Sequence, residues 1–414
     1  MASDPCDQGR AGSRLLPLCE AREQLLRVAQ PLARENEPLA LNRARGRILA
    51  QAVRLDRAEP PVARSAMDGF AIRSADGTEA RELLGTMYAG TAGQPQLGPG
   101  QAVEVMTGGT VAMGADAVIP VEWTRVDAGQ LFVEQAVRAG QHVRRAGEMG
   151  ELGQEVIPVG ALLDVASLAA AASCGADPVQ VYAAPRATVL STGDEVVAWT
   201  EQPGKHQVRD ANRLATALQI QAAGGEVLST RRIADEPVLL REAVDAAMDQ
   251  SDLVVTIGGV SMGKKDYLPE VFASLGIDKL FHGVAVQPGK PVWVGRCERA
   301  WVVGLPGNPV SSAVMTELLV RPLLRRLAGA QPAPGLPLQA CRLAEAVRTR
   351  GRERFFPATL EASADGLPWV QPHAGRGSGD WTVLSKMQVL LRVPPHMELA
   401  AGELAHYLPL EHNS

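Results

Sequence analysis

Three glycine-bearing stretches of the sequence each follow an apolar run and end in polar side chains. Residues 192–195 read Thr-Gly-Asp-Glu, residues 258–263 read Gly-Gly-Val-Ser-Met-Gly, and residues 304–311 read Gly-Leu-Pro-Gly-Asn-Pro-Val-Ser. Glycine loops of this kind can offer backbone N–H groups to an anion. Carboxylates together with substrate phosphate are the usual ligands of magnesium. The pattern indicates a pocket for a phosphorylated ligand and an oxygen-bound cation.

The second loop nearly matches the Walker A pattern, in which a Ser or Thr follows the lysine and binds magnesium. Lys265 occupies that position, after Lys264, so a P-loop NTPase is excluded. Backbone N–H groups for an anion remain as the chemical interpretation of the loop. The alternative is that its glycines serve only a tight turn between a strand and a helix.

Two other polar positions have a structural alternative, because each precedes an expected helix. In the third loop, Asn308 or Ser311 could cap the helix that follows, and capping is compatible with anion binding. Asp235 precedes Pro237, so a role as N-cap is the more ordinary interpretation. Asp194 and Asp266 are harder to explain structurally, because they lie in or beside the glycine-rich loops.

A lysine and two further stretches complete the candidates. Lys290 lies in the turn Gln-Pro-Gly-Lys-Pro at 287–291, where an ammonium could attract an oxyanion or could simply be solvated. Residues 65–71, Ser-Ala-Met-Asp-Gly-Phe-Ala, and 106–109, Met-Thr-Gly-Gly, combine polar groups with glycine. Taken alone, both of these stretches are weak signals.

The three loops belong to a segment in which strands and helices alternate, which predicts a mostly parallel sheet. We expect strands at 187–191, 226–230, 252–257, 292–294 and 301–303, and helices near 211–223, 238–250, 269–275 and 310–327. Ligands bind at the carboxyl ends of the strands in such sheets, so the loops should meet in one crevice.

The flanking segments differ from this one in the spacing of their apolar residues and in their Gly and Pro content. Helical spacing over 15–52 predicts two helices separated near 31–38, and 162–174 predicts another helix of the same kind. Between them, 53–145 has short β-branched runs divided by Gly and Pro, typical of a small β domain inserted into a helical one. Residues 328–337 resemble a linker, followed by β segments at 343–347, 358–361, 369–371 and 389–393.

Composition limits the classes of function. With 414 residues, several cores are expected. The net charge of −5 and only 16 aromatic residues argue against nucleic-acid binding. The five cysteines form no C-x-x-C pair, so a zinc cluster is not indicated. No apolar run approaches the ~20 residues of a membrane span, and no secretory signal is recognised, so we expect a cytoplasmic protein without membrane contact.

Taken in order, these motifs resemble the molybdopterin molybdenumtransferase family, that is, the MoeA family that includes the gephyrin E domain. The resemblance spans about residues 15–395. It implies a homodimer of elongated subunits with four domains. These are a discontinuous helical domain I (1–52 and 147–183), an inserted β domain II (53–146), a molybdopterin-binding α/β domain III (184–330) resembling MogA, and a C-terminal β domain IV (331–414).

The resemblance also implies the reaction, in which molybdate is inserted into adenylylated molybdopterin and AMP is released with the help of Mg²⁺. By motif, the carboxylates near nucleotide and magnesium are Asp194, Glu195 and Asp266. Asp68 and Thr107 match positions that complete the site across the dimer interface, and Asp235 and Lys290 also match functional positions. The remaining substrate-binding residues implied are Thr192, Gly193, Gly258, Gly259, Ser261, Gly263, Pro306, Asn308, Ser311, Arg352 and Ser378.

One departure from the family pattern and one motif assignment each leave a question open. Gln287 stands where the family commonly has a basic residue, which leaves the preference between molybdate and tungstate unresolved. Arg352 is assigned through a short motif in which Arg350 and Arg354 are close neighbours.

The alternative functions are a molybdopterin adenylyltransferase, against which the additional domains argue, and a non-catalytic scaffold like gephyrin, against which the carboxylate set argues. Protein partners implied by the pathway are the adenylyltransferase and the molybdoenzymes that receive the cofactor, each in transient contact.

Overall fold

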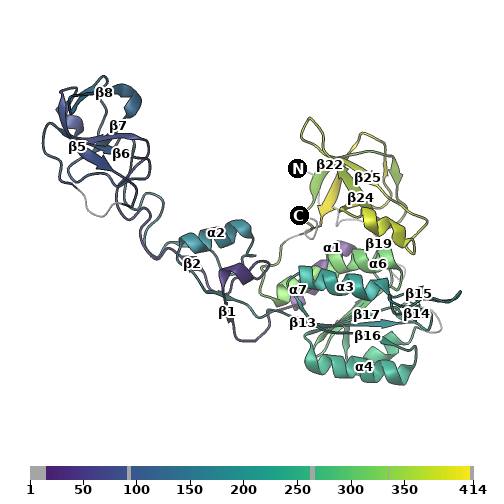
Figure 1. The fold of residues 1–414 in the computed structure, drawn as a ribbon. Coiled ribbons are helices and arrows are strands. Elements are labelled where there is room, and N and C mark those ends of the chain that lie inside the picture. The colour runs from purple at the N-terminus through teal and green to yellow at the C-terminus, as the bar shows by residue number, and fades with distance from the viewer. Residues whose placement is uncertain (1–14, 91–94, 262–265, 334, 411–414) are drawn as a thin grey trace.

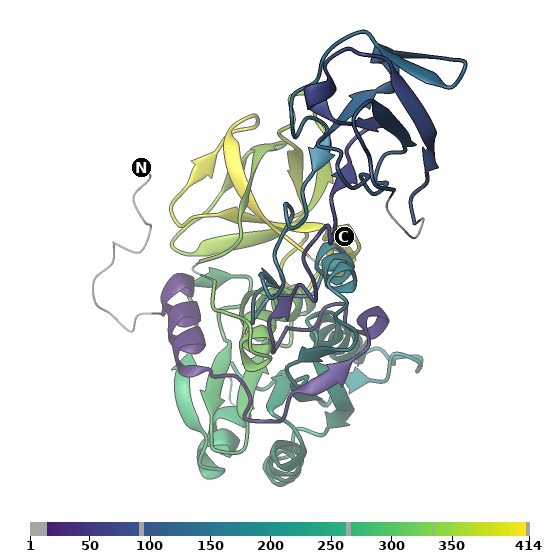
Figure 2. The same cartoon turned by 90° about the vertical axis from the view of Figure 1, so that its left-hand side faces the viewer.

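The computed structural model describes residues 15–90, 95–261, 266–333 and 335–410. Across these residues the chain forms three six-stranded sheets. Figure 1 shows an elongated molecule, in which one sheet lies at the end of a narrow connection, apart from the other two. Figure 2, turned by 90°, views the molecule with this outlying sheet toward the viewer. No helix of the described residues is both long and apolar enough to cross a lipid bilayer.

The central sheet belongs to the α/β unit and is mostly parallel, as the sequence predicted. Its strand order is β16 (Glu226–Ile233), β13 (Arg186–Thr192), β17 (Leu253–Ile257), β21 (Trp301–Leu305), β20 (Trp293–Arg296), β18 (Asp278–His282). The first four strands run parallel, and β20 is antiparallel to both of its neighbours. The predicted strands are confirmed, whereas β18 was missed because this short edge strand, Asp-Lys-Leu-Phe-His, has only two adjacent apolar residues and no alternation.

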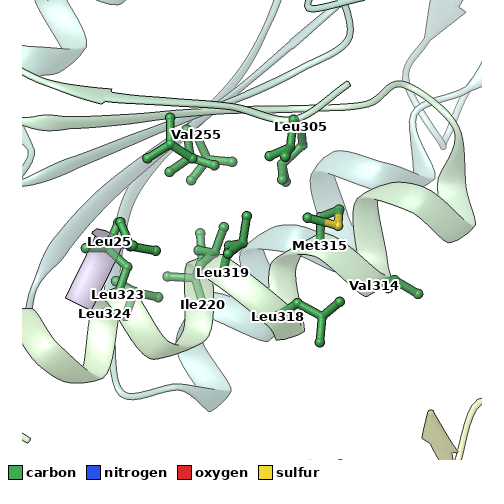
Figure 3. Close-up of a cluster of buried hydrophobic side chains, with 14 of the residues drawn as sticks. Leu25, Ile220, Val255, Leu305, Val314, Met315, Leu318, Leu319, Leu323 and Leu324 are labelled. Atoms are coloured by element: carbon green, nitrogen blue, oxygen red, sulfur yellow. The ribbon is translucent and has the colours of Figure 1, made fainter. Parts of the chain in front are cut away.

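Helices cover both faces of this sheet, so the central strands β13, β17 and β21 are buried at every position except Arg186. Val189, Val255 and Val303 point into one core and Val254 and Val302 into the opposite one. The elements of the first layer are α3 (Ala211–Ala222), α6 (Pro309–Met315), the π-helical segment η4 (Thr316–Val320) and α7 (Arg321–Leu327). The second layer contains α4 (Pro237–Gln250) and α5 (Leu268–Ser274). Figure 3 shows the first core, where Leu319 of η4 points toward the strands that carry Val255 and Leu305, whereas Leu318 points away from them.

The opening helix α1 (Leu18–Val28) packs into this same core through Leu18, Ala21 and Leu25. The second helix predicted within 15–52 is wrong. The chain there forms β1 (Glu37–Leu39), a single 3₁₀ turn η1 (Leu41–Arg43) and isolated β-bridges at 48 and 49. Pro38 supplies no N–H and Gly46 adopts φ +79°, so the apolar spacing is not realised as a helix.

Three short antiparallel pairs carry the chain outward and back. They join β1 to β12 (Val179–Val181), β2 (Val53–Arg54) to β11 (Glu155–Ile157), and β3 (Arg64–Ser65) to β10 (Val143–Arg144). Helix α2 (Val165–Ser173) packs beside them, and Asp164 caps it by accepting a 2.7 Å hydrogen bond from the Ser167 N–H. This middle unit therefore contains more strand and less helix than the sequence indicated.

The distal sheet is the β insertion. Its order is β7 (Ala117–Pro120), β4 (Gly69–Ile72), β6 (Gln101–Val105), β5 (Arg81–Met87), β9 (Gln130–Val133), β8 (Thr124–Asp127). Phe70, Ile119 and Leu131 fill its own core. The other short elements there are η2 (Ser74–Asp76) and η3 (Val121–Trp123). Because this core is separate from the others, the distal sheet is a distinct packing unit (Figure 1).

The C-terminal sheet closes into a barrel. Its order is β19 (Val286–Gln287), β24 (Glu353–Glu361), β25 (Trp369–Pro372), β22 (Gln339–Leu343), β28 (Leu404–Pro409), β26 (Val389–Val393), and β26 also pairs with β24. The barrel unit also holds β23 (Val347–Arg348), β27 (Glu398–Leu399) and η5 (Trp381–Lys386). Since β19 comes from the α/β unit, the barrel and the α/β unit share backbone hydrogen bonds.

Candidate functional site

The three glycine loops meet at the carboxyl ends of β13, β17 and β21, as the parallel sheet predicted. The Gly258 N–H donates to the Leu305 carbonyl at 3.0 Å. A Cβ atom on Gly307 would lie 3.6 Å from Gly258 Cα, and one on Gly258 would lie 2.9 Å from the Thr192 carbonyl oxygen. Gly258 and Gly259 have φ of +92° and +63°. Residues without side chains therefore allow the loops to touch.

Asp235 joins this cluster in a way that the sequence did not indicate. The N-cap of α4 is Glu236, so the expected capping role of Asp235 is wrong. The Asp235 carboxylate instead accepts a hydrogen bond from the Thr192 hydroxyl. The backbone N–H of Asp235 lies 3.4 Å from an oxygen of Asp194. The ends of β13 and β16 are thereby linked through their polar side chains.

Asp194 and Glu195 are exposed to solvent beside buried Gly193. The Gly193 backbone has φ +141°, and a Cβ there would meet both Glu195 oxygens at 3.0 Å. Among the residues that the structure describes, no three Asp, Glu, His or Cys side chains gather into a metal-binding group. Magnesium in nucleotide enzymes is commonly held by only one or two carboxylates plus substrate phosphates and water. The oxygen-only donors at this edge fit that kind of shared site.

Residues of the second loop are partly outside the described ranges. Ser261 is exposed and Asp266 is half-buried, immediately before Tyr267 at the start of α5. The Leu268 N–H donates to the Gly259 carbonyl at 3.3 Å, which ties the beginning of α5 to the loop. Gly263, Lys264 and Lys265 lie outside the described residues.

The third loop connects the α/β unit to the barrel. Asn308 occupies the N-cap position of α6, but its side chain makes no capping hydrogen bond. Its amide donates instead to the Ser378 hydroxyl at 2.9 Å, and the Val310 N–H donates to the Ser378 carbonyl at 3.2 Å. Ser311, in the first turn of α6, is buried at 3% exposure. Predicted residues from two separate sheets are therefore in direct contact.

The turn that carries Lys290 lies against both the helix layer and the barrel. Lys290 is exposed, and a Cβ on neighbouring Gly289, with φ +120°, would lie 2.3 Å from Met315 Sδ. Only glycine permits this approach of the turn to α6. The preceding strand β19 contains Gln287, which is exposed and pairs with Arg354.

The barrel arginines differ in their contacts. Arg352 donates to the Val286 carbonyl in β19 at 3.4 Å. Arg354 places its guanidinium 4.0 Å from the centre of the Phe356 ring, and burial lowers its pKa. Arg350 is exposed. Of the three, Arg352 is the one whose side chain is hydrogen-bonded to the strand leading into the Lys290 turn.

Asp68 directly precedes β4 and Thr107 follows β6, both strands of the distal sheet, which Figure 1 shows apart from the α/β unit that carries the loops. One Asp68 oxygen accepts hydrogen bonds from the Thr107 N–H at 2.6 Å and from the Thr107 hydroxyl at 2.8 Å. These bonds lower the pKa of the exposed Asp68 carboxyl, since both favour its ionised form. The pair is a preformed anionic group, at a distance from the strand-end cluster.

Two positioning residues were not recognised from the sequence. Asn212, in the first turn of α3, donates its amide to the Gly307 carbonyl at 2.7 Å. His282, at the end of β18, places its Nε2 2.9 Å from the Val260 carbonyl. The only sequence feature that could have pointed to Asn212 is its place two residues after Asp210, the N-cap of α3, in the first turn of that helix. Both residues hold backbone atoms of the glycine loops rather than offering groups to a ligand.

Three family models match the chain in the order of its units. The MoeA N-terminal region (domains I and II) matches residues 16–175, a probable molybdopterin-binding domain matches 188–326, and the MoeA C-terminal region (domain IV) matches 341–410. A molybdopterin molybdenumtransferase from Haemophilus influenzae is 36% identical over 318 residues, covering 76% of this chain and 78% of that protein. The chain belongs to the MoeA family. The resemblance inferred from the motifs is thereby confirmed.

Other MoeA relatives extend over nearly the whole chain. Molybdopterin molybdenumtransferase 2 of Mycobacterium tuberculosis is 32% identical over 395 residues, covering 92% of this chain and 95% of that protein. The crystal structure of the molybdopterin biosynthesis MoeA protein from Pyrococcus horikoshii OT3 has 25% sequence identity and a TM-score of 0.81, covering 96% and 100% of the two chains. The MoeA fold therefore includes the distal unit and the barrel.

Proposed function

We propose that this MoeA family member inserts molybdenum into adenylylated molybdopterin and releases AMP, forming molybdenum cofactor. The relatives described above from Haemophilus influenzae and Mycobacterium tuberculosis carry the name molybdopterin molybdenumtransferase. The observation on which the proposal chiefly depends is that the three strand-end loops meet and that the third of them contacts Ser378 of the barrel. That arrangement gives one region glycine N–H groups, carboxylates and hydroxyls, which a pterin nucleotide and an oxyanion both require.

The residues divide by chemistry in this proposal. The backbone of 258–261 and the residues Thr192, Gly193 and Pro306 form the surface for the pterin nucleotide. Ser261, Lys290, Ser311, Arg352 and Ser378 would hold pterin or molybdate through hydroxyl and cationic donors. Asn308 holds Ser378 in place through its amide. Preorganised donors of this kind stabilise developing negative charge without moving during the reaction.

Asp194, Glu195 and Asp266 would hold Mg²⁺ together with the phosphates of the nucleotide. When bound, the ion would neutralise the phosphoanhydride whose cleavage releases AMP. The Asp235 carboxylate is held by the Thr192 hydroxyl. The backbone N–H of Asp235 in turn orients the carboxylate of Asp194. Removal of divalent ions with EDTA should stop AMP release, and excess Mg²⁺ should restore it. Unchanged release in EDTA would contradict the magnesium assignment.

The position of Asp68 and Thr107 favours a homodimer. In one chain they adjoin β4 and β6 of the distal sheet, and Figure 1 shows that sheet well away from the α/β unit that carries the loops. If they act in the reaction, they must reach the loops of a second copy. The four-domain division stated above and a cytoplasmic location are parts of the same proposal. Sedimentation of the full chain should give the mass of two copies, whereas a monomer at assay concentrations would exclude a shared site.

The function is tested by mass balance. The protein is incubated with adenylylated molybdopterin, Mg²⁺ and molybdate, and released AMP is measured. AMP release that requires molybdate supports insertion. Consumption of ATP with unadenylylated pterin would replace the proposal by adenylyltransfer, and the absence of both reactions would point to a scaffold.

Asp266→Asn tests the carboxylate group. The substitution is nearly isosteric, so the variant should fold and should lose most of the AMP release. The matched control is Asp278→Asn at the start of β18, where exposed Asp278 pairs with Arg296 at the opposite end of the sheet. The control should retain full turnover. Retained turnover in Asp266→Asn would remove Asp266 from the metal site.

A further inference from the structure

A cavity that the strand-end loops do not line lies where α1, α7, residues 330–333 and 335–337, and the end of β28 meet. Its volume is about 280 Å³. Loop 160–162 of the middle unit also lines it, so segments from every unit except the distal one contribute to its walls. None of the residues assigned above to the pterin nucleotide or to molybdate borders this cavity.

The charge of the lining is unbalanced. Four arginines line the cavity, namely Arg22, Arg321, Arg325 and Arg326, against the single carboxylate of Glu317. Glu317 is already engaged, because Arg321 Nε donates to one of its oxygens at 2.6 Å and Gln219 donates to the other at 2.7 Å. The lining thus carries a net excess of positive charge.

Arg22 is the central observation. Its side chain comes from α1 and is nine-tenths buried, at 9% exposure. Its hydrogen bonds go to two neutral acceptors, the Leu318 carbonyl at 2.5 Å and the Gly335 carbonyl at 3.2 Å. A guanidinium has five N–H donors, so two carbonyls do not exhaust it. Burial without a carboxylate partner lowers the pKa of Arg22 to about 10, which leaves it protonated at neutral pH.

Arg326 repeats this pattern at the rim. Its donors reach the Ala29 carbonyl at 3.1 Å, the Ala330 carbonyl at 3.4 Å and the Gln30 amide oxygen at 3.2 Å, which are all uncharged. Buried cations are normally paired with an anion, because desolvation of an unpaired charge is costly. Two arginines bonded to neutral acceptors around one hollow therefore leave a place for an external negative group.

The remainder of the lining is apolar. Leu26, Ile48, Leu162, Leu336 and Leu408 contribute hydrocarbon surface, together with several prolines. A cavity of about 150 Å³ holds benzene, so the volume here suits a ligand of the order of ten to fifteen non-hydrogen atoms. We propose that this cavity binds a small organic carboxylate, with the carboxylate against Arg22 and its hydrocarbon body against the leucines. The planar fork of arginine matches a carboxylate in geometry.

The test uses ¹⁹F NMR on the full chain with three probes that share a 4-fluorophenyl ring. 4-Fluorobenzoate should bind, and neutral 4-fluorobenzamide should bind at least about tenfold more weakly, because it lacks the charge-assisted hydrogen bond. Equal binding of the amide, or no binding of the benzoate at millimolar concentration, would overturn the proposal. Tighter binding of 4-fluorophenyl phosphate than of the benzoate would overturn the carboxylate assignment.

Variants locate the site. Arg22→Met should weaken benzoate binding at least about tenfold, while Arg27→Met, on an exposed position of the same helix outside the cavity lining, should not change it. Leu26→Trp fills the cavity while keeping all four arginines, and it should abolish binding even if Arg22→Met fails to fold. Benzoate binding that persists in Leu26→Trp would show that the carboxylate binds elsewhere and would refute the assignment.

Discussion

Replacing Gly258 by alanine tests the contact between the glycine loops. The backbone at Gly258 has φ +92°, outside the left-handed region that alanine tolerates best. Its new Cβ would lie 2.9 Å from the Thr192 carbonyl oxygen, so backbone must move. Strain of this kind costs about 1–3 kcal/mol, and the close contact adds to it. We expect the free energy of unfolding to fall by about 3 kcal/mol.

Gly276→Ala is the matched control for this substitution. Gly276 follows α5 with φ +69°, and a Cβ there would meet nothing within 4 Å. The control therefore carries the backbone cost alone, about 1 kcal/mol. The expected difference of about 2 kcal/mol corresponds to a factor of about 30 in the unfolding equilibrium. Urea unfolding of both variants measures it.

Activity provides the second measurement. Movement of the Thr192 and Gly258 backbones displaces groups that we place against the nucleotide. An error of about 1 Å in such positioning costs on the order of 100-fold in rate. Gly258→Ala should therefore lose most molybdate-dependent AMP release while Gly276→Ala keeps it. If the two variants unfold at the same urea concentration and turn over alike, the close approach of these loops is not what shapes the site.

Two further predictions concern side-chain pairs. Thr107→Val removes one donor to Asp68, so the lowered pKa of that carboxyl should rise toward its usual range, as followed by ¹³C NMR. The local stabilisation that the ionised Asp68 carboxylate provides is present above the usual carboxyl pKa and is lost as the pH falls through the lowered pKa. A pKa of Asp68 that is the same in Thr107→Val as in the unsubstituted protein would contradict the hydrogen bond. Glu317→Gln leaves buried Arg321 without its carboxylate and should cost about 3–5 kcal/mol in urea unfolding, whereas Arg299→Gln, which breaks an exposed pair, should leave the midpoint nearly unchanged. Equal losses in these two variants would refute the role of burial.

The α/β unit was predictable because its strands are buried on both faces. β13, β17 and β21 appear in the sequence as short apolar runs, each followed at once by a glycine loop. Convergence of the loops follows from parallel strand direction alone. The second predicted helix failed for the opposite reason, since the spacing of Leu39, Ile48 and Leu49 is also compatible with bridges to other segments.

Side-chain roles near the site were less predictable than the loops themselves. Asp235 and Asn308 each precede a helix, and both have residue types that favour capping. The structure uses them instead for contacts with Thr192 and Ser378, which are far away in the sequence. Local pattern contains no information about such distant partners. For the same reason, the sequence did not predict that the Arg22 guanidinium would be buried against neutral acceptors.

The pairing of Glu37–Leu39 with Val179–Val181 has a consequence for how the polypeptide assembles. Closing a flexible loop becomes more costly as the loop lengthens, and here an entire independently packed sheet lies within it. The strands that lead out to the insertion pair with the strands that return from it. An insertion that has already folded therefore brings both halves of the middle unit together and shortens the conformational search for their pairing. The order in which the two strands are translated then matters little for their pairing. A folding defect in the remote insertion would first slow the pairing of these two strands.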